Sequence, residues 1–195
     1  PPVTPRQAIL ALWGTCLIWG ASFPLAKLAL ADASPMAFTA SRFLLATLLL
    51  LPPLREATAE EWKAGGALGV LLALGFSAQT IGLGYTTASR SGFITAMYIP
   101  LTPLVVLTAY RAVPDLLALA GIVVAVGGMF LLTRPEQLGG GLNAGDLLTL
   151  LCALCFAVHM VVTGALARRF RVERLMMTQI ATAAVLTTLA TPLLE

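Results

Sequence analysis

Long apolar stretches alternate with short polar links along the whole chain, and the stretches are too long for β-strands. A helix that crosses the hydrocarbon core of a bilayer, about 30 Å thick, needs roughly 20 mostly apolar residues. Stretches of this length predict seven membrane-spanning helices, at residues 8–31, 34–53, 65–87, 91–110, 115–133, 145–167 and 175–193.

The composition supports this interpretation. Of the 195 residues, 58% are hydrophobic and 11% are charged, whereas soluble domains contain about 25% charged residues. The first stretch is too long for a cleavable signal peptide and contains Trp13, Pro24 and Lys27. We therefore expect an all-α membrane protein, a polytopic helix bundle whose first helix stays in the mature protein.

The basic residues of the links indicate the orientation. When the links are assigned alternately to the two sides of the membrane, one side contains only Arg90 and Arg134. The other side receives Arg6, Arg55, Lys63, Arg111, Arg168, Arg169, Arg171 and Arg174. Since Lys and Arg accumulate in cytoplasmic loops, the N-terminus is predicted to be cytoplasmic. The net charge of +3 thus reports topology and gives no reason to expect a nucleic-acid partner.

The chain contains a weak internal repeat. An offset of 136 residues lays the sixth stretch over the first, with Cys152 on Cys16, and the seventh over the second. A repeat of five helices, an odd number, would invert its second copy across the membrane. Residues 1–135 are then the first five-helix repeat, and residues 136–195 are a Gly-rich connector and the first two helices of the second. Seven of an expected ten helices are present, which predicts a fragment or completion by self-association.

Five motifs follow one another at matching spacing. They are "WGASFPLAK", "SRFLLATLLLLP", "GLGYTTASRSGFITAMYIPLTPLVVL", "LALAGIVVAVGGMFLL" and "GDLLTLLCALCFAVHMVVT". In this order the chain resembles EamA-type members of the drug/metabolite transporter superfamily. It departs from them in the short link "YRAVPD" between the fourth and fifth helices and in the absence of the last three helices, which removes part of the expected cavity.

The resemblance implies a function. It implies a multi-pass protein of the cell inner membrane that exports or exchanges small metabolites such as amino acids. Alternating access would move the substrate through a cavity between the inverted halves. The implied partners are a small-molecule substrate and the lipid bilayer, with no cofactor and no enzymatic activity.

An intramembrane serine protease is the alternative function. Gly20, Ala21 and Ser22 are similar to a turn that carries a nucleophilic serine, and His159 would be the base. Such a serine needs a helix start in a water-filled pocket, whereas Ser22 lies within the first predicted helix beside Phe23. We therefore favour the transporter.

Polar side chains within the predicted spans are the candidates for substrate binding. Four of them share one face of the fourth predicted helix: Ser91, Thr95, Tyr98 and Thr102. They either bond to neighbouring helices or line a substrate path. Nearby, Pro100 and Pro103 free backbone carbonyls, as in the broken helices of transporters.

Gln79 and His159 are the other polar groups near the middle of spans. An amide there is costly unless it finds partners, so Gln79 either lines a cavity or makes a structural hydrogen bond. His159, the single histidine, is either a substrate or proton site or a satisfied hydrogen-bonding residue. No Asp or Glu lies in mid-span, so a carboxylate proton relay is not expected.

The first two predicted helices contain the remaining candidates. Trp19 and Ser22 share a face, and Trp19, which lies too deep for an interfacial tryptophan, either lines a cavity or packs against other helices. Lys27 either reaches the outer interface or contacts an anion. Arg42 lies deeper and either holds a substrate carboxylate or pairs with backbone carbonyls. The predicted substrate-binding residues are thus Trp19, Ser22, Gln79, Tyr98, His159, Arg42, Lys27 and Thr95.

The small residues of the predicted helices are interpreted as packing residues. On the fifth predicted helix, Ala118, Gly121, Ala125 and Gly128 form a stripe that predicts close contact with another helix. The three cysteines, Cys16, Cys152 and Cys155, are expected to pack as small apolar residues and not to bind metal, because the spacing of the last two lacks further ligands.

Overall fold

The computed structural model describes residues 4–49, 54–132 and 142–194, and no strand occurs in these ranges. Its helices are α1 (Pro5–Ala29), α2 (Pro35–Leu49), α4 (Ala59–Tyr85), α5 (Ala88–Ala96), α6 (Tyr98–Tyr110), α7 (Leu116–Leu132), α8 (Ala144–Leu166) and α9 (Val172–Leu194). Outside the described residues lie 50–53 and 133 of the predicted spans, Arg134, and 136–141 of the predicted connector. The all-α prediction is confirmed.

Five helical segments of the described residues are long and apolar enough to cross a membrane. They are α1, α4, α8, α9 and the α5–α6 pair, and the apolar helices α2 and α7 are shorter. The first turn of α4 begins six residues before the predicted span. There Thr58 Oγ1 accepts a hydrogen bond from the backbone N–H of Glu61, whose carboxylate accepts one from the Thr58 N–H. Because of this capping box, the helix begins at polar residues, which hydropathy alone leaves outside the predicted span.

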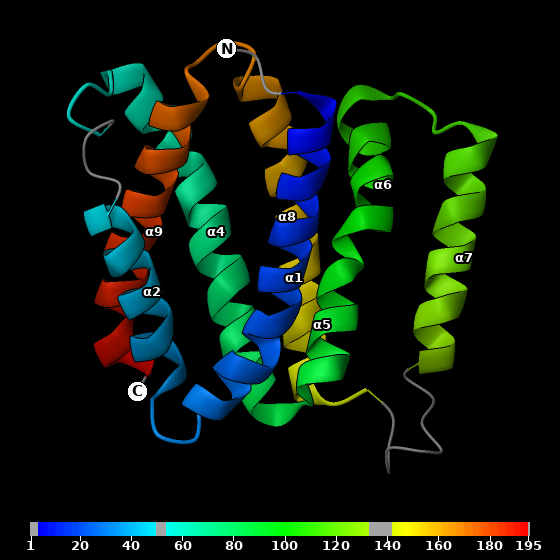
Figure 1. Ribbon diagram of the computed structural model, residues 1–195, viewed down its shortest axis with the longest axis horizontal. Coiled ribbons are helices and arrows are strands. Elements are labelled where there is room, and N and C mark those ends of the chain that lie inside the picture. Colours follow the sequence, from blue (N-terminus) through cyan, green and yellow to red (C-terminus); the bar gives the residue numbers. More distant parts are fainter. Residues whose placement is uncertain (1–3, 50–53, 133–141, 195) are drawn as a thin grey trace.

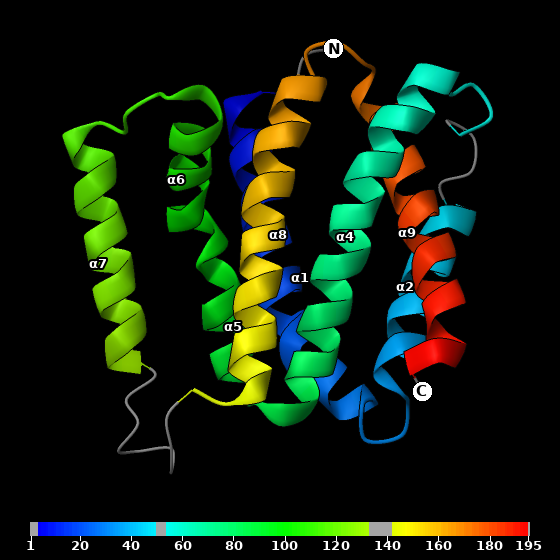
Figure 2. The same cartoon turned by 180° about the vertical axis from the view of Figure 1, so that it is seen from behind.

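Helix α4 is the centre of the bundle and packs against α8 on one side and α9 on the other (Figure 1). These three helices form one layer, which is in front in Figure 2. Helix α2 packs on α9, α1 packs on α5 and α4, and α5 and α6 pack on α8. The N-terminus and the α2–α4, α6–α7 and α8–α9 links lie at the same end of the bundle, so the links that were assigned together do lie together.

Glycines let α4 approach its neighbours closely. A Cβ at Gly69 would lie 2.5 Å from Thr182 Cβ of α9, and one at Gly82 would lie 2.7 Å from the carbonyl oxygen of Gly145 of α8. Both contacts are too short for a side chain. Because lipid tails are as apolar as leucine, close packing of this kind is a main source of association between helices in a membrane.

Replacing Gly69 by alanine is therefore expected to lower the free energy of unfolding by about 1–3 kcal/mol, the usual cost of overpacking. Gly66 is a control on the same helix, because nothing lies within 4 Å of a Cβ built there. Gly66→Ala should leave stability unchanged or raise it by up to about 1 kcal/mol through helix propensity. Denaturant unfolding in detergent measures both, and equal effects would contradict the packing described.

The predicted fourth span is two helices. Met97 ends α5 and precedes α6, and Pro100 follows in the first turn of α6. Since proline has no N–H, the carbonyl of Ala96 cannot form the i to i+4 hydrogen bond that would continue α5. The broken helix that the prolines predict is thus present, near the middle of the combined segment. Pro24 and Pro103, in contrast, lie inside continuous helices.

The contact stripe predicted on α7 is wrong for its glycines. Gly121 and Gly128 are exposed, and a Cβ at either would meet nothing within 4 Å. Ala118 and Ala125 are half-buried, and α7 packs mainly against α6. In the described residues α7 is a peripheral helix, so its small residues are not used for close approach.

Candidate functional site

Five aromatic rings from five helices meet inside the bundle. Trp19 of α1 stacks on Tyr98 of α6, with ring centroids 6.0 Å apart and planes 16° from parallel. Phe156 of α8 contacts both rings at 6.3 Å and Phe76 of α4 at 5.0 Å. Phe43 of α2 meets Phe76 edge to face at 5.3 Å. We call these five residues the aromatic cluster, and edge-to-face and offset contacts of this kind are favourable.

A buried hydrogen bond flanks the aromatic cluster. Gln79 Nε2 of α4 donates to Thr95 Oγ1 of α5 at 3.0 Å, and both side chains are buried. Of the two interpretations of Gln79, the structural bond is therefore present. The amide carbonyl Oε1 accepts no hydrogen bond from any described residue, so Gln79 keeps one acceptor for a ligand.

This bond gives a direct stability prediction. Thr95→Val keeps the side-chain shape but leaves the Gln79 amide unpaired, so it should lower the free energy of unfolding by about 1–3 kcal/mol. Adding Gln79→Met to Thr95→Val should recover part of that loss, with a coupling near 1 kcal/mol. Thr188 is exposed on α9, and Thr188→Val is the control that should change little. Strictly additive effects of Gln79→Met and Thr95→Val would show that the bond contributes nothing.

His159 lies one turn from Phe156 on α8. Its Nε2 is 2.5 Å from Oε1 of Gln179 of α9, and the Gln179 amide nitrogen contacts Met176 Sδ at 2.7 Å. Gln179 is almost fully buried, while His159 is half-buried. His159 is thus a half-buried, hydrogen-bonded residue, and the pair joins α8 to α9.

Arg42 of α2 reaches the same region. Its guanidinium carbon lies 5.2 Å from the ring centre of Phe76 and 5.4 Å from that of Phe38. Such cation–π contacts stabilise a guanidinium. Arg42 has no ion pair or hydrogen bond with the described residues, so the pairing with backbone carbonyls is not seen there, and the contact with a substrate carboxylate stays a prediction. A charge at this depth without a partner is typical of a functional site.

Two other predicted residues have local partners. Ser22 Oγ donates to the Trp19 carbonyl at 2.6 Å, within α1. Lys27 Nζ donates to the carbonyls of Leu83 and Gly84, at 2.5 and 3.1 Å. The lysine does point to the end of the bundle opposite the N-terminus. Its charge ends on the C-terminal carbonyls of α4, where a cation is favourable, and not in open solvent.

The structure gives no support to the protease alternative. The hydroxyl of Ser22 is bonded to its own helix, and the imidazole of His159 is bonded to Gln179. Among the described residues no group of three His, Cys, Asp or Glu could hold a metal ion. Cys152 and Cys155 are buried as expected, whereas Cys16 is exposed on α1.

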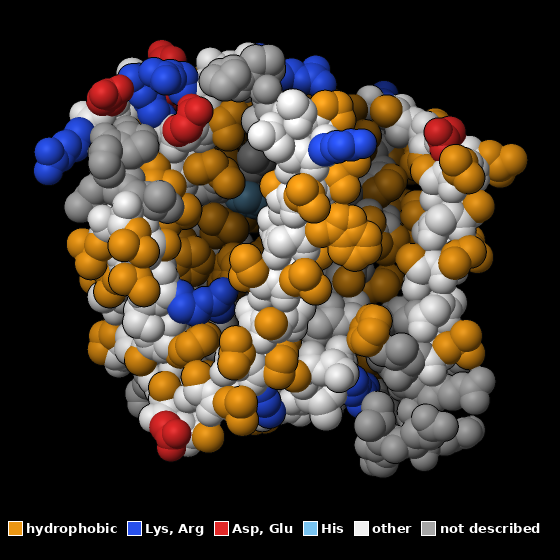
Figure 3. All heavy atoms as spheres, in the orientation of Figure 1, with side chains coloured by type: hydrophobic (Ala, Val, Ile, Leu, Met, Phe, Trp, Pro, Cys, Tyr) orange, Lys and Arg blue, Asp and Glu red, His pale blue; other side chains and the backbone are white. Residues whose placement is uncertain are grey.

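The aromatic cluster is partly open. Trp19, Phe76 and Tyr98 are half-buried, and Figure 3 shows the face of the molecule hollowed between α1 and α2, with hydrophobic side chains on its walls. Aromatic walls, a free amide acceptor and an unpaired guanidinium together suit a small amphipathic molecule that carries a carboxylate.

Sequence reasoning missed part of this region. Phe76 and Phe156 connect the other rings, and each belongs to the apolar core between α4 and α8. Gln179 was also missed, because it lies near the start of the last predicted span, 175–193, and not in its middle. For the phenylalanines no signal exists in the sequence, because an apolar ring in an apolar helix does not stand out.

The apolar helical segments long enough to cross a membrane, with these polar and aromatic groups between them, define the described residues as a multi-pass α-helical membrane protein. Residues 6–134 match the EamA-like transporter family, and the chain therefore belongs to this family, an EamA-type member of the drug/metabolite transporters. An uncharacterized transporter of Archaeoglobus fulgidus is 38% identical over 161 residues, which are 83% of this chain and 50% of the relative. The chain thus spans about half the length of that relative. No solved structure matches it.

Proposed function

We propose that the protein moves small amphipathic metabolites such as amino acids across the cell inner membrane, as an exporter or exchanger with a cytoplasmic N-terminus. The observation that carries this proposal is the partly open aromatic cluster, with Arg42 over one of its rings and Gln79 beside it. A transported molecule needs a site at mid-depth that binds it without trapping it.

Each polar group has a role in the proposed site. The guanidinium of Arg42 holds the carboxylate of the substrate, and Gln79 Oε1 accepts from its amino group. Trp19 and Tyr98 enclose the apolar side chain. His159, one turn from Phe156 on α8, is the one side chain of these whose unperturbed pKa lies close to neutral.

Three further predicted residues support this site by holding its side chains and helices in position. Thr95 holds the amide of Gln79 in place, and Ser22 is tied to the backbone of Trp19. Lys27 anchors α1 to the end of α4. We assign these three to positioning the helices of the site, with less direct contact to the substrate than the sequence suggests.

The proposed repeat explains the hollow between α1 and α2. Helices α8 and α9 correspond to α1 and α2 at the offset of 136 residues, and α4 packs against both α8 and α9. In an inverted second repeat, the helix that corresponds to α4 would pack against α1 and α2 and close the hollow. Residues 1–135 and 136–195 then belong to two halves of a ten-helix carrier that rock against each other.

Counterflow tests the proposal. Purified protein in liposomes loaded with unlabelled amino acids should accumulate the matching labelled amino acid from outside. Labelled nucleosides and sugars serve as comparison substrates. If a nucleoside or sugar exchanges and none of the amino acids does, the substrate class is wrong. If none of these compounds exchanges and the protein binds none of them, the transport proposal fails for this chain.

A further inference from the structure

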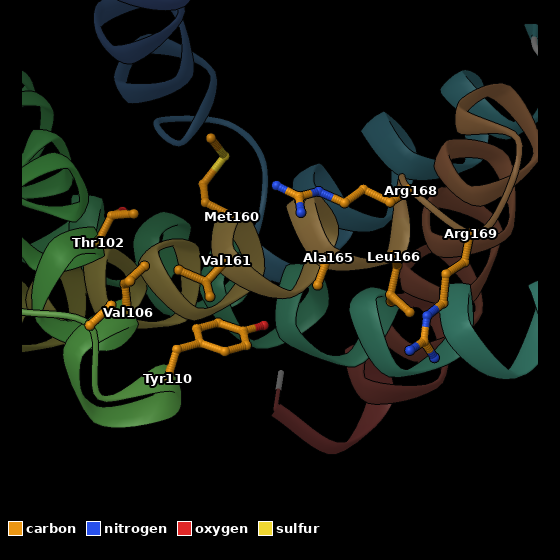
Figure 4. A pocket seen from close by; sticks show the side chains of 11 residues that line it. Thr102, Val106, Tyr110, Met160, Val161, Ala165, Leu166, Arg168 and Arg169 are labelled. Atoms are coloured by element: carbon orange, nitrogen blue, oxygen red, sulfur yellow. The ribbon is translucent and has the colours of Figure 1, made fainter.

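A second hollow lies outside the proposed substrate site, at the end of the bundle that carries the N-terminus. It has a volume of about 830 Å³ and lies between the C-terminal halves of α6 and α8 (Figure 4). Val106 and Tyr110 of α6 point across it toward Val161 and Ala165 of α8. Its size is within the roughly 300–1,000 Å³ of ligand sites.

Two adjacent arginines stand at one end of this hollow. Arg168 and Arg169 follow Ala167, the C-cap of α8, and line the hollow, and both are exposed. Neither forms an ion pair with an acidic group in the described part of the chain. By contrast, the nearby Arg174 is paired with Glu56 and Glu61. The mouth therefore has two uncompensated positive charges.

The rest of the hollow is apolar and open to the outside of the bundle. Met160 is 53% exposed, and Gly164 is exposed with nothing within 4 Å of a Cβ built there. A smaller hollow of about 360 Å³ lies further along the same pair of helices, lined by Leu101 of α6 and by Leu147, Leu150, Leu151 and Leu154 of α8. From Leu154 to Leu166, the last residue of α8, the helix rises about 18 Å, comparable to the depth of one leaflet.

We infer that this groove binds one anionic phospholipid, with its phosphate on Arg168 and Arg169 and an acyl chain along the seam between α6 and α8. The charge, the apolar lining and the length each match one part of such a lipid. Basic pockets between membrane helices bind anionic headgroups in this way. The inference is independent of the substrate that the protein carries.

Lipid retention measured by native mass spectrometry tests the inference. The protein is exchanged into micelles with equal amounts of palmitoyl-oleoyl phosphatidylglycerol and phosphatidylcholine, and the ratio of the two bound lipids is recorded. Phosphatidylglycerol should be enriched, and Arg168→Gln with Arg169→Gln should reduce this enrichment about tenfold. Arg55→Gln with Lys63→Gln removes the same charge from exposed residues at the same end and should preserve it. Equal loss in both double variants would overturn a specific site.

A second variant tests the groove itself. Gly164→Phe fills the open space while both arginines are kept, and it should lower the number of bound phosphatidylglycerol molecules by one, whereas Gly121→Phe on the exposed face of α7 should not. Millimolar inorganic phosphate should leave the lipid bound; displacement would mean that a soluble anion is the ligand and would overturn the lipid assignment. A change of oligomeric state in Gly164→Phe with unchanged lipid retention would assign the groove to a second copy of the chain.

Discussion

Replacing Arg90 by methionine is expected to lower the free energy of unfolding by about 3–5 kcal/mol, the cost of leaving a buried charge without its partner. The guanidinium of Arg90 in α5 lies 2.5 Å from the carboxylate of Asp146 in α8, and both side chains are buried. Thr86 Oγ1 donates to the same carboxylate at 2.7 Å, and Asp146 forms a capping box with Asn143 at the start of α8. One carboxylate thus joins α4, α5 and α8.

A double variant separates the cost of an unpaired buried charge from the simple loss of the contacts of Arg90. Asp146→Asn removes the negative charge but keeps an oxygen for Thr86. Arg90→Met combined with Asp146→Asn should therefore be more stable than Arg90→Met alone, by about 2 kcal/mol or more. Denaturant unfolding of the three variants in detergent gives the comparison. If the double variant is as unstable as the sum of the single ones, the buried charge is not the cause.

Replacing Trp19 by alanine is expected to raise the half-saturation concentration for transport about 30-fold, or about 2 kcal/mol of substrate binding, as for an aromatic residue at the centre of a binding site. The reason is the stacked pair of Trp19 and Tyr98, which forms one wall of the proposed site. Tyr98→Ala should act in the same direction. Initial rates of counterflow against substrate concentration measure both.

Trp13 provides a matched control on the same helix. It lies on the outside of the bundle and is 65% exposed, so Trp13→Ala removes the same side chain from a surface that faces lipid. This variant should transport with unchanged half-saturation. A similar loss in Trp13→Ala and Trp19→Ala would mean that α1 is merely destabilised, and the wall assigned to Trp19 would be wrong.

Local signals in the sequence predict the helices of this protein well. Apolar length predicts where the helices are, and Pro100 marks the break near Met97. Boundaries fail where polar residues continue a helix beyond the apolar stretch, as at Thr58 and Glu61. There the capping box is itself visible in the sequence, and it would have corrected the start of α4.

The candidate site is only half predictable, because its residues become neighbours through packing. Gln79 and His159 stand out as polar groups in apolar helices, yet their partners Thr95 and Gln179 depend on which helices touch. For the same reason the sequence, in which Arg90 belongs to a link and no Asp or Glu lies in mid-span, does not predict the ion pair of Arg90 with Asp146. A polar residue in an apolar helix indicates that it has a hydrogen-bonding or charged partner, and the fold determines which residue that partner is.

The central claim is that substrate binds against Trp19, and tryptophan fluorescence tests it most directly. The chain has three tryptophans, so Trp13→Phe with Trp62→Phe leaves Trp19 as the single emitter. Titration with the amino acid that exchanges best in counterflow should change the emission of this variant saturably, with a midpoint near the half-saturation of transport. A variant that keeps only Trp13 should not respond. A transported amino acid that leaves the Trp19 emission unchanged would contradict the claim.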